Sequence, residues 1–252
     1  MIPGRGGTWY GRAMADDTYE LVIRAPGRNA LSRELMERLL GALREAAGRP
    51  LVLRGVDGVF SAGLNLREVA ALDASGMAAF LRLLEALIGA LYDYPGPTVA
   101  CVDGHAIAGG CVLALCCDWR VAADQPQLRL GLNEVALGLE FPPAILALVR
   151  DRVPRRHIER VVLEAGLYDP VTACALGLVD EVAADAPTAA RAALARLAAS
   201  PAETYRATKR AVHAGVLALS AAQQRDFEER IVPAWCAPAT KARIAAVLER
   251  RR

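Results

Sequence analysis

The chain has 252 residues, of which 54% are hydrophobic and 23% are charged, and its formal net charge is +2. This composition excludes a disordered chain and is sufficient for one large α/β domain. With 5% aromatic residues and no basic block, the sequence lacks the features of a nucleic-acid-binding protein. No apolar run reaches the roughly 20 residues that span a bilayer. We therefore expect neither nucleic acid nor membrane as a partner.

The six cysteines and three histidines are scattered, and no CxxC or other metal-ligand spacing is present. Most of the cysteines lie in apolar runs, where cysteine behaves as a small hydrophobic residue. We therefore expect no metal site, and a reducing, cytoplasmic setting.

In chain order, residues 1–13 are rich in glycine and aperiodic, and we expect a flexible N-terminal extension there. Apolar residues then predict a strand at 19–24, and Ser32 is a suitable cap for a helix over 33–47. A short buried strand is expected at 50–56. Strand and helix thus alternate from the start of the ordered chain.

The alternation continues to about residue 125. Residues 57–63 indicate a loop, 64–72 a short helix, and 75–94 a long amphipathic helix that Pro95 ends. The next expected elements are a strand at 98–104, a buried helix at 108–118 and a strand at 119–124. Such a pattern implies βαβ units and a mostly parallel sheet.

Helices dominate the rest of the chain. A strand and loop at 128–139 precede a helix that begins at the Pro142–Pro143 pair, and the last strand is expected at 177–184. From residue 187 onward the sequence is helical without strands. These last helices do not form a separate core, so we expect them to pack on the main core or on another subunit.

The segment HAIAGGCVLALCCD (105–118) joins a strand to an apolar helix through a turn of small residues. A P-loop needs Lys and Ser or Thr where Cys111 and Val112 stand, and neither GxGxxG nor GxSxG is present. Cys111 has no nearby His or Asn in sequence, so a packed thiol is expected rather than a nucleophile. Gly109 and Gly110 allow a ligand to approach the unpaired N–H groups of the first helical turn, which suit an oxyanion. A tight packing turn is the alternative interpretation.

A second loop of small residues lies in GVFSAGLNL (58–66). Like the first, it leads from a strand into a helix. Two such loops after two strands of a parallel sheet lie side by side at its carboxyl edge, where ligands bind. Each loop can then donate one N–H to the same oxygen.

FSAGLNL, then VDGHAIAGGCVLALCCDWRVAAD, then LGLNEVALGL occur in an order and spacing that resemble the enoyl-CoA hydratase/isomerase (crotonase) superfamily, from about Tyr19 to Val182. The resemblance implies the α/β class, with a crotonase-like (ClpP/crotonase) spiral of ββα units and a C-terminal helical region. It also implies a homotrimer or hexamer. We divide the chain accordingly into the extension at 1–13, a spiral core at 14–195 and a C-terminal helical trimerisation region at 196–252.

The resemblance also implies an acyl-CoA thioester as substrate, with coenzyme A as part of the substrate and no separate cofactor. The main-chain N–H groups of Ala62 and Gly109 are implied as an oxyanion hole, and Glu134 as the catalytic acid and base. Lys209, with Arg206 and Arg210 beside it, is a candidate for the CoA 3′-phosphate. The expected substrate-binding residues are Gly63, Leu64, Asn65, Gly110, Val112, Arg28 and Lys209.

One departure from the family pattern changes the expected reaction. Hydratases of this family carry a second Glu at the position of Val112, and the two carboxylates activate a water. Val112 accepts no proton, and AGGC followed by GLNE is similar to the Δ3,Δ2-enoyl-CoA isomerases. We therefore expect Glu134 to shift the double bond of a 3-enoyl-CoA to the trans-2 position. We expect apolar neighbours to raise the pKa of Glu134. These neighbours are Val112, Leu132, Leu137, Leu139 and Phe141.

Two rival functions stay open from the sequence. Enoyl-CoA hydratase, or another lyase or hydrolase of this fold, becomes possible if Glu140 enters the site as a second acid. Asp118 is another carboxylate near the motif, but pairing with Arg120 or a backbone turn is expected for it. A non-catalytic crotonase-like scaffold needs neither Glu134 nor two oxyanion loops, and both are present.

Overall fold

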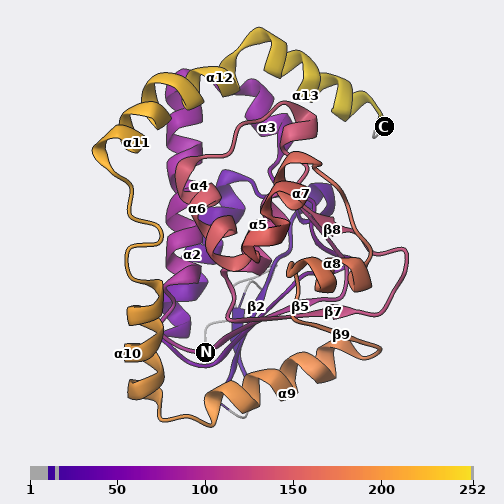
Figure 1. The fold of residues 1–252 in the computed structure, drawn as a ribbon, viewed down its shortest axis with the longest axis vertical. Helices are drawn as coiled ribbons and strands as arrows, with labels where there is room; N and C mark the ends of the chain where they lie inside the picture. The colour runs from indigo at the N-terminus through magenta and orange to yellow at the C-terminus, as the bar shows by residue number, and fades with distance from the viewer. Residues whose placement is uncertain (1–10, 15–16, 251–252) are drawn as a thin grey trace, which may run out of the picture.

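The computed structural model describes residues 11–14 and 17–250. Two sheets pack against central helices, and the C-terminal helices run along one side of the molecule and across its top (Figure 1). The large sheet has the strand order β1-β2-β3-β5-β7-β9, and only β1 in it is antiparallel to its neighbour. Its strands are β1 (Gly11–Ala13), β2 (Tyr19–Val22), β3 (Leu51–Arg54), β5 (Thr98–Val102), β7 (Trp119–Ala123) and β9 (Glu181–Ala183).

The small sheet has three parallel strands in the order β4 (Val59–Ser61), β6 (His105–Ile107) and β8 (Leu130–Gly131). Each follows a strand of the large sheet along the chain: β3 leads to β4, β5 to β6 and β7 to β8. A helix then follows each pair, which is the ββα spiral that the sequence resemblance implied. The prediction of a simple loop at 57–63 is wrong for β4, and β6 was not expected as a separate strand.

Polar side chains cap the first turns of two helices, close to the positions where the sequence predicts that these helices begin. The Leu35 N–H donates to Ser32 Oγ at 3.2 Å and begins α2, and Asp73 caps α4 through the Gly76 N–H at 2.7 Å. The helices of the core are α1 (Pro26–Asn29), α2 (Arg33–Ala46), α3 (Leu66–Ala71), α4 (Ala74–Tyr92), α5 (Gly109–Cys116), α6 (Pro143–Arg152), α7 (Ile158–Leu163), α8 (Pro170–Leu176) and α9 (Ala186–Ala198), with the 3₁₀ turns η1 (Val135–Leu137) and η2 (Arg155–His157).

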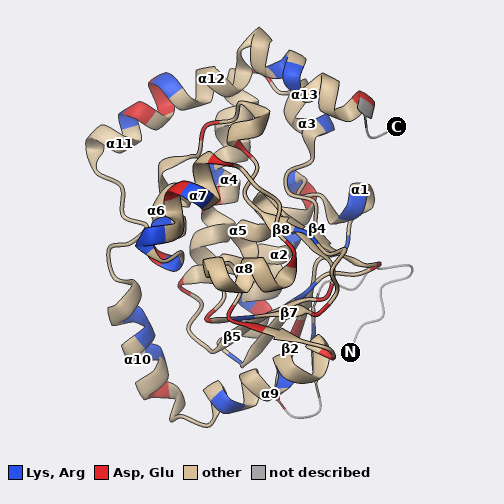
Figure 2. Ribbon diagram, turned by 45° about the vertical axis from the view of Figure 1, so that its right-hand side comes forward, with Lys and Arg blue, Asp and Glu red and all other residues tan. Residues whose placement is uncertain are grey.

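Helices α4 and α5 form the centre of the core. Every residue of α5 is buried, and Figure 2 shows no charged residue on it, whereas Lys, Arg, Asp and Glu are dispersed over the outer helices. By length and apolar composition α4 meets the criteria for a membrane span, although Arg82 and Glu85 interrupt its apolar residues. In this fold α4 packs against α2, α5, α6 and α12, as a core helix does.

Two of the expected domain boundaries shift. Gly11–Ala13 form β1 and pair with Tyr19–Leu21, so this part of the expected extension is wrong, while residues 1–10 lie outside the described residues. The boundary at 195/196 falls inside α9, which packs on β5 and β7 and therefore belongs to the core. The helices after it are α10 (Ala202–His213), α11 (Ala221–Asp226), the π-helical turn η3 (Phe227–Ile231), α12 (Val232–Cys236) and α13 (Pro238–Arg250).

A buried ion pair fastens α10 to the large sheet. Lys209 Nζ lies 2.9 Å from Asp118 Oδ2, with the two side chains 7% and 11% exposed, and it also donates to the Gly96 carbonyl. The same Asp118 oxygen accepts from the N–H of Thr98 and the hydroxyl of Tyr205, both at 2.9 Å. Asp118 therefore holds groups of α10 and β5 together, and it does not pair with Arg120, whose partner is Asp180.

We expect Lys209→Met to lower the free energy of unfolding by about 3 kcal/mol, because the buried Asp118 carboxylate loses its directly bonded cation and keeps only the Arg152 guanidinium, 4.0 Å away. The hydrogen bonds from Thr98 and Tyr205 keep the loss at the lower end of the usual range. Urea denaturation measures the change. Arg210→Met on the exposed face of α10 is the matched control, expected within about 0.5 kcal/mol of the wild type; equal stability of the two variants would contradict the structural role of Lys209.

Candidate active site

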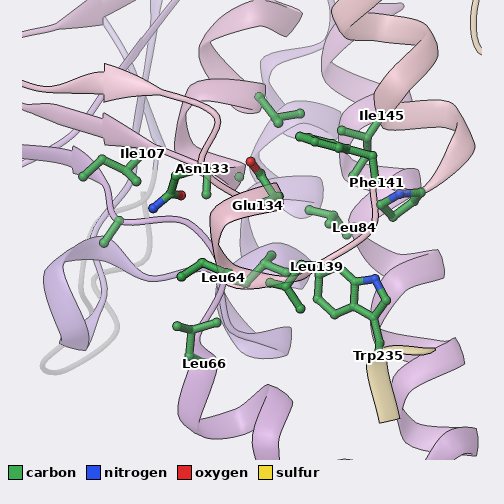
Figure 3. A pocket seen from close by; sticks show the side chains of 16 residues that line it. Leu64, Leu66, Leu84, Ile107, Asn133, Glu134, Leu139, Phe141, Ile145 and Trp235 are labelled. Carbon is green, nitrogen blue, oxygen red and sulfur yellow. The ribbon is translucent and has the colours of Figure 1, made fainter. Parts of the chain in front are cut away.

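An apolar pocket lies where the β4–α3 loop, the start of α5 and the segment after β8 meet (Figure 3). Helices α3, α4, α6 and α12 complete its walls. Its lining residues are Ala62, Leu64, Leu66, Leu84, Ile107, Ala108, Gly109, Val112, Asn133, Glu134, Leu137, Leu139, Phe141, Pro142, Ile145 and Trp235.

The two small-residue loops touch each other in the folded chain, as the sequence predicted. Gly63 has a φ of +83°, and a Cβ at this position would lie 2.9 Å from both the Ala108 Cβ and the Ile107 carbonyl oxygen, and 3.2 Å from the Gly109 nitrogen. Only glycine combines this backbone conformation with so close an approach. The contact therefore fixes the distance between the two loops.

The amide that the first loop offers is that of Leu64, and the prediction of Ala62 is wrong. The Ala62 N–H donates to the Arg28 carbonyl at 3.1 Å, so it is not available to a ligand. Leu64 lies opposite Leu31 in an isolated parallel β-bridge. The two hydrogen bonds of this bridge involve the neighbours of Leu64: the Leu31 N–H donates to the Gly63 carbonyl, and the Asn65 N–H donates to the Leu31 carbonyl. The N–H of Leu64 itself then points to the other side of the chain, and it has no acceptor within the described residues.

The second amide is that of Gly109, the first residue of α5. Its N–H precedes the first helical hydrogen bond, from Val112 N to Ala108 O at 3.0 Å, and meets no acceptor in the part of the chain that the structure describes. Ala108 caps the helix with φ +52° and ψ −125°, a conformation that costs an L residue energy. The positive end of the helix dipole adds to the attraction for an anion.

Two of the predicted substrate contacts are structural instead. A Cβ on Gly110 would lie 2.3 Å from the Ser61 carbonyl oxygen, so this glycine allows α5 to pack on β4 and does not line the pocket. Asn65 caps α3 by accepting the Glu68 N–H at 3.3 Å. Leu64 and Val112 do line the pocket, and Gly63 positions its neighbours.

Glu134 reaches the pocket from the segment between β8 and η1. The residue is 8% exposed, its Oε2 has no partner in the described structure, and burial raises its pKa to about 7. Of the predicted apolar neighbours, Val112, Leu137, Leu139 and Phe141 line the same pocket, whereas Leu132 is buried outside it. Glu134 is therefore a carboxylate that takes up and releases a proton near neutral pH.

Glu134 is the one carboxylate that lines this pocket among residues 11–14 and 17–250. Glu140, which the sequence left open as a second acid, is exposed and forms an ion pair with Arg230 outside the pocket. The other polar side chain in the lining is Asn133, whose buried Oδ1 also has no hydrogen-bond partner in the described structure.

The predicted cations do not meet at the pocket. Lys209 is bound to Asp118 in the cluster described above, so its assignment to a CoA phosphate is wrong for this chain by itself. Arg28 is exposed and contributes its carbonyl group to the loop rather than a side chain to the lining. His105 accepts the Arg129 N–H through Nδ1 at 3.0 Å.

Cys111 is a packed thiol, as predicted. It is buried in α5, and burial raises its pKa to about 12. A thiol with this pKa carries almost no thiolate at neutral pH and is a poor nucleophile.

Sequence patterns did not identify eight of the lining residues. Ile107, Ala108, Asn133 and Pro142 lie beside predicted residues, whereas Leu66, Leu84, Ile145 and Trp235 come from four different helices. Apolar residues on an amphipathic helix predict only that the face is buried. Which of them border a cavity depends on how the helices are arranged.

Comparisons with known proteins place this geometry in a family. The sequence model described as enoyl-CoA hydratase/isomerase matches residues 19–252. Mouse and human mitochondrial enoyl-CoA delta isomerase 1 are 35% identical over 166 residues and 32% identical over 195 residues, which are 64% and 74% of this chain. The chain spans 57% and 64% of the length of these two relatives.

Relatives named as hydratases are also similar. A probable enoyl-CoA hydratase of Mycolicibacterium paratuberculosis is 31% identical over 216 residues, 83% of each protein. Among solved structures, the human mitochondrial Δ3-Δ2-enoyl-CoA isomerase superposes with a TM-score of 0.87 at 27% identity, over 92% of this chain and 93% of that chain. The fold, the convergent loops and the matched sequence agree, and the chain belongs to the enoyl-CoA hydratase/isomerase family.

Proposed function

We propose that this enzyme moves the double bond of a 3-enoyl-CoA to give the trans-2-enoyl-CoA. The observation that carries the proposal is a single buried carboxylate, Glu134, with an unpartnered oxygen in a pocket whose other lining side chains are apolar except for Asn133. The relatives named as isomerases support the same reaction.

The reaction requires a base, an oxyanion site and the return of one proton. Glu134 removes a proton from C2, and the electrons of that C–H bond form a dienolate with its charge on the thioester oxygen. The N–H groups of Leu64 and Gly109 stabilise this charge. Glu134 then delivers the same proton to C4, the double bond lies between C2 and C3, and no other reactant is consumed.

Hydration is the rival reaction, and the relatives named as hydratases make it worth testing. It requires a water molecule that is held and deprotonated beside the double bond. Val112, on the first turns of α5, offers this water no hydrogen bond, and Glu140 lies outside the pocket. The pocket therefore favours proton transfer between carbon atoms over the addition of water.

Purified enzyme incubated with 3-hexenoyl-CoA and with crotonyl-CoA separates the two reactions. We expect 2-hexenoyl-CoA to form without its 3-hydroxy derivative, and crotonyl-CoA to stay unchanged over the same time. Chromatography of the thioesters measures both. Rapid hydration of crotonyl-CoA would overturn the proposal.

We expect Glu134→Gln to lower kcat by roughly 100- to 10,000-fold, because an amide neither takes nor returns the proton. Affinity for acyl-CoA should stay within about threefold, since the amide has the same shape. Steady-state kinetics and calorimetric titration with hexanoyl-CoA measure the two effects. Glu37→Gln, in an exposed carboxylate of α2 outside the pocket lining, is the matched control and should retain full activity. Turnover in Glu134→Gln equal to this control would assign the base elsewhere.

The pH profile of kcat/KM should rise from acid to neutral pH with an apparent pKa of about 7. The base is active as the carboxylate, and burial raises its pKa, so a larger fraction of Glu134 is protonated and inactive below pH 7. At pH 6 we expect roughly one tenth of the plateau value. A profile that is flat between pH 5 and pH 8 would contradict this assignment of the base.

A further inference from the structure

The pocket has two chemically different ends (Figure 3). Asn133 and Glu134 lie toward one end, together with the start of α5. The other side of the pocket is apolar: Phe141 and Ile145 lie together there, and Trp235 lies apart from them, next to Leu139. A thioester oxygen on the Leu64 and Gly109 amides would place C2 to C4 beside Glu134, so the rest of the acyl chain runs toward Trp235.

Trp235 is held in place on this apolar side. Its indole N–H donates to the Glu140 carbonyl at 3.0 Å, and the residue is 3% exposed. The helix that carries it, α12, packs against α4, which contributes Leu84 to the same wall. The side chain is therefore a fixed wall of the pocket rather than a movable surface group.

The segment that leads to Trp235 is fastened over the core by both apolar and charged contacts. Phe227, Ile231, Val232 and Trp235 are all buried, and the π-helical turn η3 brings them to one side of the segment. On the outer side, Arg230 pairs with Glu140 and with Asp226. The Arg230–Glu140 pair connects this segment to the residue whose carbonyl holds the indole.

We propose that Trp235 closes the acyl pocket and sets the upper limit on acyl-chain length, so that the enzyme selects short acyl groups such as six-carbon chains over twelve-carbon chains. The direction of the chain rests on the proposed function, but selection by length is a property of binding. A chain longer than the pocket has to displace packed side chains such as Trp235, and overpacking of this kind lowers affinity by about 5- to 150-fold. A few unaccommodated carbons therefore suffice for strong discrimination.

The test measures binding of two saturated thioesters, hexanoyl-CoA and dodecanoyl-CoA, which carry no double bond to be moved. We expect wild-type enzyme to bind dodecanoyl-CoA at least about tenfold more weakly than hexanoyl-CoA. Trp235→Leu replaces the indole by a smaller side chain and should reduce this ratio to near one or reverse it. Calorimetric titration provides the dissociation constants.

Two further variants make the result specific. Trp119→Leu removes a tryptophan of β7 that lies outside the pocket lining, and it should keep the wild-type ratio. Ile145→Ala opens the same apolar side from α6 without altering the C-terminal segment, and it should shift the ratio in the same direction as Trp235→Leu. Ile145→Ala thus keeps the test decisive if Trp235→Leu does not fold.

Equal binding of both thioesters by the wild type would overturn the proposal, as would an unchanged ratio in a folded Trp235→Leu variant. Isomerase turnover of 3-hexenoyl-CoA is measured in parallel. Length selection without turnover would overturn the proposed function and leave the role of Trp235 standing. Turnover without length selection would overturn the role of Trp235 and leave the proposed function standing. If neither thioester binds, both proposals fail.

Discussion

The contact between Gly63 and the start of α5 is the constraint on which the rest of the site depends. It brings two loops from different turns of the spiral within van der Waals distance, and the hydrogen bonds of the first loop to Arg28 and Leu31 leave one amide, that of Leu64, free to face the ligand. Ala108, with its positive φ, precedes Gly109, which lines the same pocket as Leu64. Two unsatisfied donors at a fixed separation are costly in a buried position, and an oxyanion is the ligand that compensates them.

The Glu134 carboxylate is, like these amides, a polar group that is costly to bury without a partner. An unpartnered Glu134 oxygen in an apolar pocket favours the neutral acid, which destabilises the charged form of the folded protein. The same desolvation places its pKa where the group exchanges a proton readily. The rest of the core is regular and densely apolar. Buried polar groups without partners, such as this carboxylate oxygen, concentrate at functional sites.

The C-terminal helices are part of the site as well as of the surface. The ion pair of Lys209 with Asp118 fastens α10 to the end of the large sheet, and the buried face that includes Phe227 and Ile231 fastens the later segment over α4. Because Trp235 follows directly, the shape of the pocket depends on residues about 100 positions from the base in sequence. The spiral core and the C-terminal helices therefore form the pocket together.

The sequence by itself determined the alternation of strands and helices, the capped start of α2, the apolar character of α5, the family resemblance and the assignment of Glu134, because these depend on local periodicity and on motif spacing. It indicated a strand near β8 but did not reveal β4 and β6 or the small sheet that the three form, since strands of two or three residues carry no usable period. Only the tertiary structure decided which loop amide is free, that Lys209 is buried beside Asp118, and that Trp235 borders the pocket. Each of these depends on which distant backbone or side chain occupies the neighbouring space, and that information is not contained in the spacing of residues along one chain.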